Sequence, residues 1–472
     1  MSKENNDHFM PDDSFRDSIG TISEDGKRKW VYAKKPKGKL YDYRSYLSYF
    51  FLGLLFAGPW IRIGGEPFLL INVIDRKFSI FGEVFWPQDI HLFAMAMITG
   101  VVFVVLFTVV FGRLFCGWIC PQTIFMELVF RKIEYWIEGD YKHQIKLSKQ
   151  KWDAEKIRKK GLKHLVFFII SVGISNTFLA YVIGSEELLA IQMGNPLDHI
   201  VGLLLLLGFS GLFYGVFAHF REQVCIAVCP YGRLQGVMLD RNSVVVAYDY
   251  SRGEGRGKWG GKNEVRSEVG KGDCIDCRAC VDVCPTGIDI RNGTQLECVN
   301  CTACIDACDD MMLKVGLEPR LIGYFSEANL ADKQSFKITP RIMAYVAVLV
   351  VLVVVMGAFI FGRTDVETSI LRTPGMMYLK HEDGRIKNLY NYKMVNKTNE
   401  NFNFNFKLVD LEGEIEMVGQ KMHVEDKGVA EGAMFVIIPK ENLDGRKTKI
   451  EIEVYSGDRK IETVKTNFMG PG

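Results

Sequence analysis

The chain has 472 residues, which is enough for about three domains. Its 58 Lys and Arg against 56 Asp and Glu give a formal net charge of +2, which argues against a nucleic-acid-binding protein. Hydrophobic residues make up 48% of the chain, and they are concentrated in long stretches rather than spread evenly.

The first segment of the chain is polar. Residues 1–40 carry nine Lys or Arg and lack the apolar core that a signal peptide needs. We therefore expect residues 1–44 to form a disordered cytoplasmic tail.

Five apolar stretches come next, each close to the ~20 residues that a helix needs to cross a bilayer. They are Tyr46–Ile63, His91–Phe111, Leu165–Gly184, Leu197–Ala218 and Ile342–Phe361. The first is the weakest, because it is short and carries Gly58 and Pro59 near its end. We predict four spans in a membrane region at 45–241 and a fifth span at 340–363.

The distribution of Lys and Arg predicts the orientation of these spans. Residues 113–161, between the second and third spans, carry eleven Lys or Arg. The loop between the third and fourth spans has none and contains Glu186 and Glu187. Because positively charged loops stay on the cytoplasmic side, we expect the N-terminus inside and, with five spans, the C-terminus outside. The sequence thus predicts a multi-pass protein of the cytoplasmic (inner) membrane.

The first two helical hairpins each end in a C-x3-C-P motif, at Cys116–Pro121 and Cys225–Pro230. Cysteines four residues apart on a helix lie on one face, one turn apart, and the following proline kinks or ends the helix. Soft sulfur ligands favour Cu(I), zinc or the iron of an iron–sulfur centre. The candidate copper or additional redox site consists of Cys116, Cys120, Cys225 and Cys229. The spacing does not decide between copper, a third cluster, redox thiols and cysteines that only pack.

A charged, glycine-rich linker, Ser251–Gly272, opens the next region, residues 242–339. Its composition predicts a flexible tether that does not pack against the rest of that region. The stretch Tyr248–Arg256, which overlaps the start of the linker, is equally compatible with a solvated loop and with a role in docking metal clusters.

The most specific motif of the chain is a pair of C-x2-C-x2-C-x3-C repeats between Cys274 and Cys308. This spacing is typical of bacterial two-cluster ferredoxins, in which the fourth cysteine of each repeat ligates the other cluster. One [4Fe–4S] cluster is then predicted on Cys274, Cys277, Cys280 and Cys308. The second is predicted on Cys298, Cys301, Cys304 and Cys284.

One departure from the motif is visible, and two alternative interpretations accompany it. Pro285 follows Cys284, but Asp309 follows Cys308, which loosens the second turn without removing a ligand. Zinc sites and a disulfide framework are the alternatives, and the doubled spacing argues against both. The predicted cytoplasmic position suits clusters, because thiols stay reduced there.

The C-terminal part, 364–472, changes character. Asn401–Phe406 and Lys449–Tyr455 alternate polar and apolar residues, which predicts half-buried antiparallel strands. About 110 residues of this kind fit a periplasmic β-sandwich of the immunoglobulin type. The predicted fold class is therefore a mixed, multi-domain membrane protein: an α-helical membrane region of five spans, a bacterial-type two-cluster ferredoxin module and an immunoglobulin-like sandwich.

Four histidines lie near the ends of the predicted spans. His91 and His199 begin the second and fourth spans at the outer face, and His164 and His219 lie near the inner face. A haem or quinone role is one interpretation, and interfacial histidines at helix ends are the other.

The order of these parts resembles the cytochrome c oxidase accessory protein family, also called CcoG, FixG or RdxA. The resemblance rests on the doubled C-x3-C-P motif, the linker, the two-cluster ferredoxin spacing, one more span and the sandwich tail. It implies a membrane iron–sulfur oxidoreductase that reduces Cu(II) to Cu(I) for assembly of cbb3-type oxidase. It further implies a copper ion and oxidase subunits or copper-handling assembly factors as partners, and leaves the electron donor open.

Two other functions remain open at this point. The hairpins and clusters also resemble NapH and NosR, membrane polyferredoxins of nitrate and nitrous-oxide respiration, which implies a quinol-linked electron conduit to a periplasmic reductase. The sandwich tail favours the first family, and residues 1–45 have no room for the flavin-binding domain of a NosR-like chain. The third possibility is a non-enzymatic scaffold for oxidase assembly with structural clusters.

Overall fold

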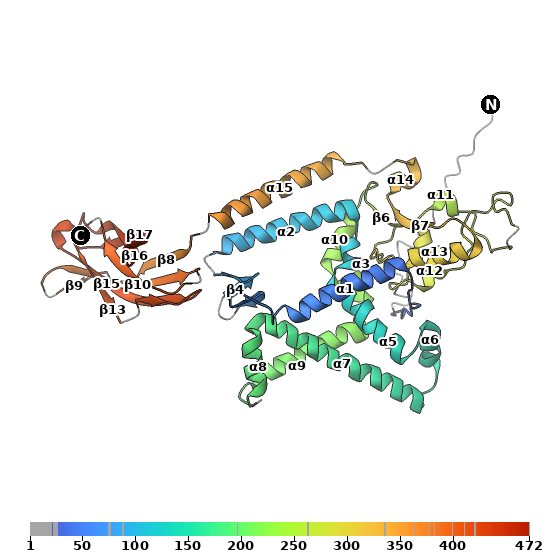
Figure 1. Ribbon diagram of the computed structural model, residues 1–472, viewed down its shortest axis with the longest axis horizontal. Coiled ribbons are helices and arrows are strands. Elements are labelled where there is room, and N and C mark those ends of the chain that lie inside the picture. Colours follow the sequence, from blue (N-terminus) through green and yellow to red (C-terminus); the bar gives the residue numbers. More distant parts are fainter. Residues whose placement is uncertain are drawn as a thin grey trace. The chain divides into compact units, whose positions relative to one another are not determined.

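The computed structural model describes most of the chain, namely residues 21, 27–73, 77–86, 89–195, 197–261, 264–334, 337–362, 364–375, 377–381, 383–398, 400–409, 411–419 and 422–471. The chain divides into two compact units (Figure 1). The first contains the residues up to 355, except 63–66 and 82–86. The second contains those two segments and the residues from 356 onward.

Within the described residues, four helical segments are long and apolar enough to cross a membrane. They are Ile90–Phe111 (α2), Ala154–Ile183 (α7), Ile200–Phe220 (α9, Ile200–Gly215, continued by the π-helical η4, Val216–Phe220) and Pro340–Phe361 (α15). They overlap the last four predicted spans, and α7 begins eleven residues earlier than Leu165 because the charged residues before Leu165 continue the same helix.

The first predicted span, Tyr46–Ile63, is not among these four. Its helix, α1, runs from Lys39 to Ala57 and begins inside the segment that the sequence assigns to a tail. Gly58 caps its end, and Pro59 has no N–H with which to continue it. Arg44 and Ser48 are buried in its first half, so part of this helix faces protein.

Shorter elements connect the long helices of the first unit. The helices are α3 (Leu114–Trp118), α4 (Pro121–Thr123), the π-helical η3 (Ile124–Phe130), α5 (Arg131–Ile137), α6 (Tyr141–Lys149), α8 (Ser185–Met193), the π-helical η5 (Val224–Val228) and α10 (Pro230–Met238). Five short strands lie between α1 and α2: β1 (Arg62–Ile63), β2 (Glu66–Pro67), β3 (Leu69–Asn72), β4 (Lys77–Ile80) and β5 (Glu83–Phe85).

Aromatic side chains hold the helices of the first unit together. The ring of Phe130 in η3 lies 4.8 Å from that of Phe167 in α7 and 4.6 Å from that of Phe217 in η4. All three rings are almost fully buried. Such ring pairs add to the stabilisation from burial, so this contact fixes η3 against α7 and η4.

The ferredoxin part is closed by two strands that flank the cysteine repeats. β6 (Val245–Tyr248) pairs antiparallel with β7 (Ile322–Phe325), with Val246 opposite Tyr324. The other elements are α11 (Tyr250–Gly253), α12 (Ala279–Asp282), the 3-10 turn η6 (Ile290–Asn292), α13 (Ala303–Val315) and α14 (Glu327–Asp332). Ile305 and Leu321 are buried in one core with Cys274 and Cys280, so the repeats fold around their own cysteines.

The linker Ser251–Gly272 is folded onto this part, apart from residues 262 and 263, which lie outside the described residues. The N–H of Gly257 donates to the carbonyl of Cys274 at 3.2 Å, and Arg266 donates to the same carbonyl at 3.0 Å. A Cβ on Gly272 would lie 2.0 Å from the carbonyl oxygen of Glu254. The prediction of an unpacked tether is therefore wrong, because its glycines allow backbone segments to pack closely.

The second unit is a β-domain, drawn in orange and red in Figure 1. Its strands are β8 (Val366–Arg372), β9 (Leu379–Lys380), β10 (Ile386–Asn396), β11 (Phe402–Asn403), β12 (Asn405–Leu408), β13 (Glu414–Val418), β14 (His423–Val424), β15 (Val429–Ile438), β16 (Lys447–Ser456) and β17 (Arg459–Met469), with the 3-10 turn η7 (Lys440–Asn442) before β16. Among the described residues, one sheet has the order β13-β15-β10-β8 with β9 beside β10, and another has the order β12-β16-β17.

The two sheets enclose a shared core. Tyr390 of β10 is fully buried opposite Met434 of β15, and its hydroxyl donates to the carbonyl of Asn467 in β17 at 2.9 Å. The predicted strand Lys449–Tyr455 lies within β16, where exposed and buried residues alternate. The predicted strand Asn401–Phe406 is split into β11 and β12 around the buried Phe404.

Candidate metal centres

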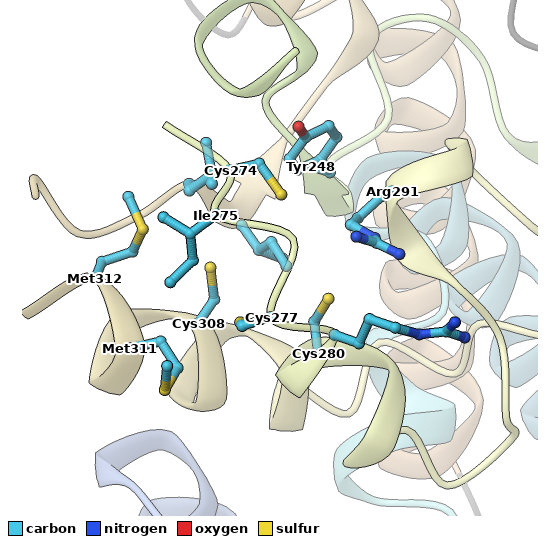
Figure 2. A pocket seen from close by; sticks show the side chains of 12 residues that line it. Tyr248, Cys274, Ile275, Cys277, Cys280, Arg291, Cys308, Met311 and Met312 are labelled. Atoms are coloured by element: carbon cyan, nitrogen blue, oxygen red, sulfur yellow. The ribbon is translucent and has the colours of Figure 1, made fainter. Parts of the chain in front are cut away.

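Four cysteines of the ferredoxin part line one cavity (Figure 2), which we call the first cavity. They are Cys274, Cys277, Cys280 and Cys308, the set that the sequence assigns to one cluster. Cys274 and Cys280 are each 7% exposed, whereas Cys277 is exposed. The four side chains therefore meet, with one of them at the protein surface.

The other four cysteines line a neighbouring cavity, the second cavity. They are Cys284, Cys298, Cys301 and Cys304, the second predicted set, and Cys280 lines this cavity as well. Cys284 comes from the first repeat, and the other three cysteines come from the second. Conversely, Cys308 of the second repeat lines the first cavity, so the two repeats exchange their fourth cysteines. None of these four cysteines is exposed, so the second cavity is more enclosed than the first.

The loops of the two repeats share one backbone pattern. Asp276 and Arg278 have φ of 50° and 57°, and Asn300 and Thr302 have φ of 53° and 65°. In both repeats these left-handed residues flank the second cysteine, and this conformation is uncommon for residues other than glycine. Successive backbone N–H groups in such turns form concave sites for anions, including iron–sulfur clusters. Asp and Asn at the same position of the two repeats are the sequence signal that could have revealed this feature.

Burial favours the protonated form of several thiols in these cavities. It raises the pKa of Cys298 to about 12 and that of Cys301 to about 11, and it raises the pKa of Cys280 as well. Iron would supply the positive charge that favours the thiolate form. The buried hydroxyl of Tyr248, which lines the first cavity, has no hydrogen-bond partner among the described residues. The cysteine donors, the concave loops and this free hydroxyl fit a bound cluster.

The C-x3-C-P motifs do not lie within single helices. Cys116 belongs to α3, whereas Cys120 follows its end and precedes α4, which begins at Pro121. Cys225 and Cys229 are arranged in the same way around the end of η5. The expectation that each pair lies one turn apart on one helix is therefore wrong. Proline cannot continue a helix, but its fixed φ suits the first position of the next one.

The four cysteines of the two motifs nevertheless lie close together. Burial raises the pKa of Cys116 to about 11 and that of Cys225 to about 12, and cysteines of both motifs add to each rise. The thiol of Cys116 donates to Oε1 of Gln235 at 3.0 Å. Within the part of the chain that the structure describes, no group of three or more His, Cys, Asp or Glu is placed to hold a single metal ion. In a cluster, by contrast, each cysteine binds a different iron, so its ligands stand further apart.

The first of these motifs packs against the second cavity. Cys116 shares an apolar cluster with Val299 and Cys301. A Cβ on Gly117 would lie 2.5 Å from the carbonyl oxygen of Val299 and 2.7 Å from that of Asn300. Only glycine permits this approach, so Gly117 places the motif directly on the loop that carries Cys301.

Two buried arginines lie beside the contact between Gly117 and the loop that carries Cys301. Nε of Arg44 donates to the carbonyl of Gly117 at 2.6 Å. Nε of Arg113 donates to Gln235 at 3.2 Å, and its Nη1 donates to the carbonyl of Leu296. Arg44 is 2% exposed and Arg113 is 4% exposed. Neither residue was predicted from the sequence, because an isolated arginine in a sequence carries no sign of burial.

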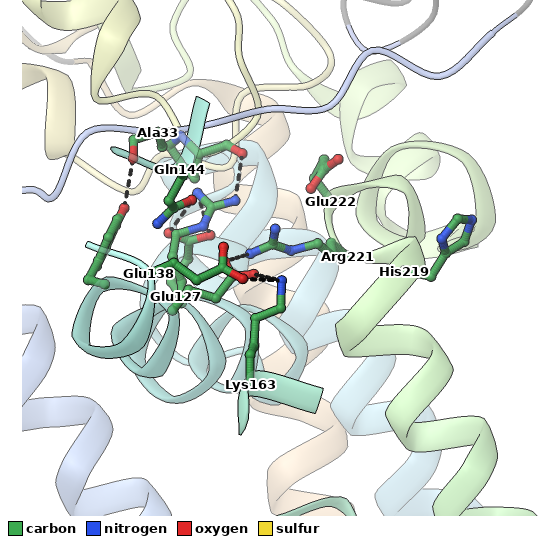
Figure 3. Close-up of polar contacts among 12 residues, drawn as sticks. Ala33, Glu127, Glu138, Gln144, Lys163, His219, Arg221 and Glu222 are labelled. Carbon is green, nitrogen blue, oxygen red and sulfur yellow. Dashed lines mark hydrogen bonds and ion pairs between the residues drawn. The ribbon is translucent and has the colours of Figure 1, made fainter. Parts of the chain in front are cut away.

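A buried cluster of charges lies between α5, α7 and η4 (Figure 3). Glu134 pairs with Arg221 at 2.5 Å and with Lys163 at 3.4 Å. Arg131 pairs with Glu127 at 3.1 Å and donates to the carbonyl of Pro285 at 3.4 Å. The cluster thus reaches the ferredoxin loop next to Cys284. The i, i+4 spacing of Glu127 and Arg131 was the available sequence signal.

Three of the four histidines lie at helix ends or near them, whereas His164 lies inside α7, because that helix begins at Ala154. His91 lies in the first turn of α2, and His199 precedes α9 and lines a cavity of about 870 Å³ between α7, α8 and α9. Nδ1 of His164 lies 2.8 Å from the hydroxyl of Tyr214, and His219 lies in η4.

Three protein-family models match the chain. Residues 220–327 match a "4Fe-4S dicluster domain", which includes all eight ferredoxin cysteines and the second C-x3-C-P motif. Residues 93–149 match a "4Fe-4S binding domain" that includes the first motif. Residues 356–471 match the "IG-like fold at C-terminal of FixG". The predicted iron–sulfur and immunoglobulin-like parts are therefore confirmed at the level of domains.

Curated relatives cover most of the chain. Protein RdxB of Cereibacter sphaeroides is 35% identical over 399 residues, covering 80% of this chain and 82% of the relative. Protein RdxA of the same organism is 34% identical, covering 75% and 76%. The nitrogen fixation protein FixG of Rhizobium meliloti is 29% identical, covering 78% and 77%.

A crystal structure of a FixG-related protein from Vibrio parahaemolyticus also matches, at 20% identity. It covers 23% of this chain and 97% of that chain, with a TM-score of 0.20. The family assignment rests instead on the sequence relatives and on the domain models. The chain is a membrane protein with four candidate transmembrane helices, 4Fe–4S binding domains and an immunoglobulin-like C-terminal domain, and it belongs to the FixG, RdxA and RdxB family.

Proposed function

We propose that this protein transfers electrons through two [4Fe–4S] clusters to reduce Cu(II) to Cu(I) for assembly of cbb3-type cytochrome c oxidase. One cluster would be held by Cys274, Cys277, Cys280 and Cys308, and the other by Cys284, Cys298, Cys301 and Cys304. When bound, such clusters take up and release single electrons. The observation that carries the proposal is the packing of Cys116, a soft copper ligand, against the loop of the second cavity.

The residues of the C-x3-C-P motifs suit copper as a substrate. Thiolates of Cys116, Cys120, Cys225 and Cys229 would favour Cu(I) over Cu(II), because soft sulfur ligands prefer the cuprous ion. Reduction of each Cu(II) consumes one electron and no proton. Gln235, which is fully buried, orients the thiol of Cys116 through its hydrogen bond.

We further propose a topology with five spans, in which α1 crosses the membrane together with the four candidate helices. The N-terminus and the ferredoxin part would then be cytoplasmic, and the immunoglobulin-like domain would be periplasmic. That domain is the part available to oxidase subunits or copper-handling assembly factors on the outer side.

Mixing the purified protein, reduced with dithionite and then freed of excess reductant, with Cu(II) tests the copper proposal. We expect the visible cluster absorbance that reduction bleaches to return, and Cu(I) to appear, detected with a chromophoric chelator. Cys116→Ala/Cys120→Ala and Cys225→Ala/Cys229→Ala should each abolish Cu(I) binding and oxidase maturation, because either pair alone offers too few soft ligands. Both variants should keep the two ferredoxin clusters. Unchanged copper affinity in both would return these cysteines to a packing role.

A second candidate function is a quinol-linked electron conduit. An apolar cavity of about 350 Å³ is lined by Phe115, Pro121 and Tyr181, next to the first C-x3-C-P motif. A hydrophobic quinone fits such a cavity. Oxidation of the reduced protein by a quinone analogue but not by Cu(II) would favour the conduit, and inertness toward both would favour an assembly scaffold.

A further inference from the structure

The charges around the second cavity are not balanced. Arg44 and Arg113 are both buried, and neither pairs with a carboxylate among the residues that the structure describes. Their partners are backbone carbonyls and the neutral side chain of Gln235. Nη2 of Arg44 is buried without any hydrogen-bond partner in the described part of the chain. An anionic group beside this guanidinium would offset the cost of its uncompensated buried charge.

These two cations act on the cysteines of the second cavity. The positive charge of Arg44 acts on Cys301, and that of Arg113 acts on Cys298. Arg113 also acts on Cys116 and Cys225 of the C-x3-C-P motifs, so it lies between these motifs and the second cavity. Glu127 also acts on Cys301, but it is paired with Arg131 at 3.1 Å. The second cavity therefore has two buried positive charges that no neighbouring carboxylate neutralises.

The first cavity differs, because each arginine beside it has a carboxylate partner, apart from the solvent-exposed Arg278. Arg291 lies 2.6 Å from Asp276 and 2.6 Å from Asp289. Arg252, whose charge reaches Cys308, pairs with Asp273 at 2.7 Å. Other pairs near this cavity are Arg256 with Glu254 at 2.7 Å, Arg320 with Asp309 at 3.5 Å and Arg266 with Glu264 at 3.7 Å. The arginines that are shielded from solvent thus have neutralising partners at the first cavity and lack them at the second.

We propose that the unpaired charges of Arg44 and Arg113 give a cluster in the second cavity a higher reduction potential than one in the first. Reduction adds one negative charge, and a buried cation stabilises that charge strongly where little water screens it. Electrons that enter near the exposed Cys277 would then be held mainly on the second cluster, beside Cys116 and the other C-x3-C-P cysteines. The inference rests on the proposed pair of clusters but not on copper as the acceptor.

An EPR-monitored redox titration of the purified full-length protein measures both potentials. Cys277→Ser assigns the signals, because it perturbs the first cluster and leaves the second. We expect the second cluster to be reduced at the higher potential in the unaltered protein. Arg44→Gln should lower that potential by at least about 59 mV. For a one-electron couple this shift changes the equilibrium ratio of electrons on the second and first clusters tenfold.

Two variants separate charge from structure. Arg44→Lys keeps the cation and should restore most of the potential. Arg278→Gln removes an exposed arginine that lines the first cavity, and it should shift the first potential little, because water screens that charge. If Arg44→Gln loses iron, Arg113→Gln paired with Arg113→Lys repeats the comparison.

The order of the two potentials in the unaltered protein decides the proposal even if every variant is unstable. A second cluster at the same or a lower potential than the first overturns it, and so does a potential that Arg44→Gln leaves unchanged. A correct order without oxidation by Cu(II) would contradict the copper function alone. A reversed order with copper reduction intact would contradict this inference alone.

Discussion

The carboxylate of Asp306 accepts the backbone N–H of Tyr41 at 2.8 Å and that of Leu40 at 3.2 Å. Asp306 belongs to α13 of the ferredoxin part, and the two N–H groups are at the start of α1. The first N–H groups of a helix lack partners within it, and a negative charge is favourable there. The ferredoxin part is therefore joined to α1 by a cap supplied from another helix.

Replacing Asp306 tests this cap. Asp306→Ala should cost about 0.5–2 kcal/mol, the usual range for a lost N-terminal cap. Hydrogen exchange at the amides of Leu40 and Tyr41 should accelerate. Asp310→Ala, which removes an exposed carboxylate of the same helix, is the matched control and should leave these amides unchanged. Equal exchange in both variants would show that Asp306 does not cap α1.

Gly117 should tolerate no side chain. Gly117→Ala would place a methyl group against the carbonyls of Val299 and Asn300, and we expect a loss of about 1–3 kcal/mol together with loss of iron from the second set. Gly173→Ala in α7 is the control, because nothing lies within 4 Å of the added Cβ. Thermal unfolding and iron content measure both effects. A stable Gly117→Ala variant with full iron content would contradict the close contact.

The exchange of fourth cysteines between the repeats predicts the iron content. We expect about eight iron and eight acid-labile sulfides per chain. Cys284→Ser should disturb the cluster that also uses Cys298, Cys301 and Cys304. EPR spectroscopy and iron analysis of this variant distinguish the two clusters. Loss of the cluster on Cys274 instead would mean that each repeat holds its own cluster with four cysteines.

Glu134 should make stability depend on pH. Burial alone would raise its pKa, but Arg221 and Lys163 hold that pKa below the ordinary value of a glutamate. Because the folded-state pKa is the lower one, these ion pairs contribute fully above the ordinary pKa of about 4.3, and their contribution is lost as pH falls through the folded-state value. Glu134→Gln should therefore lower stability at neutral pH by about 3–5 kcal/mol and flatten the loss of stability in acid.

Thermal unfolding from neutral pH down to about pH 4 measures the effect of Glu134. Glu155→Gln, on the exposed surface of α7, is the control and should change stability little. If the acid dependence of Glu134→Gln equals that of the unaltered protein, another group is responsible for it.

The proposed topology predicts the side on which three residues lie. Reporter fusions at Lys142 and Arg256 should be cytoplasmic, and a fusion at Lys449 should be periplasmic. A cytoplasmic reporter at Lys449 would mean that α1, or one of the four candidate helices, does not cross the membrane.

Much of the site could be predicted from the sequence, because the spacing of cysteines along the chain is enough to identify the ligand sets. Eight cysteines in two C-x2-C-x2-C-x3-C repeats predicted two sets, and the same sets line the two cavities. Hydropathy predicted four of the helices, since an apolar stretch of about twenty residues is a local property. Alternation predicted β16, because each residue of a strand faces the side opposite to its neighbours.

Only the tertiary structure decided what surrounds these cysteines. Tens of residues or more separate Arg44, Arg113 and Gln235 in the chain. No local sequence pattern therefore predicts that they lie together beside Cys116. The same holds for Gly117 and Val299, whose backbones approach because neither α3 nor the ferredoxin loop places a side chain between them. Sequence spacing specifies which atoms are able to bind a metal. The charge and the packing around those atoms depend on contacts between distant segments, which form only when the chain folds.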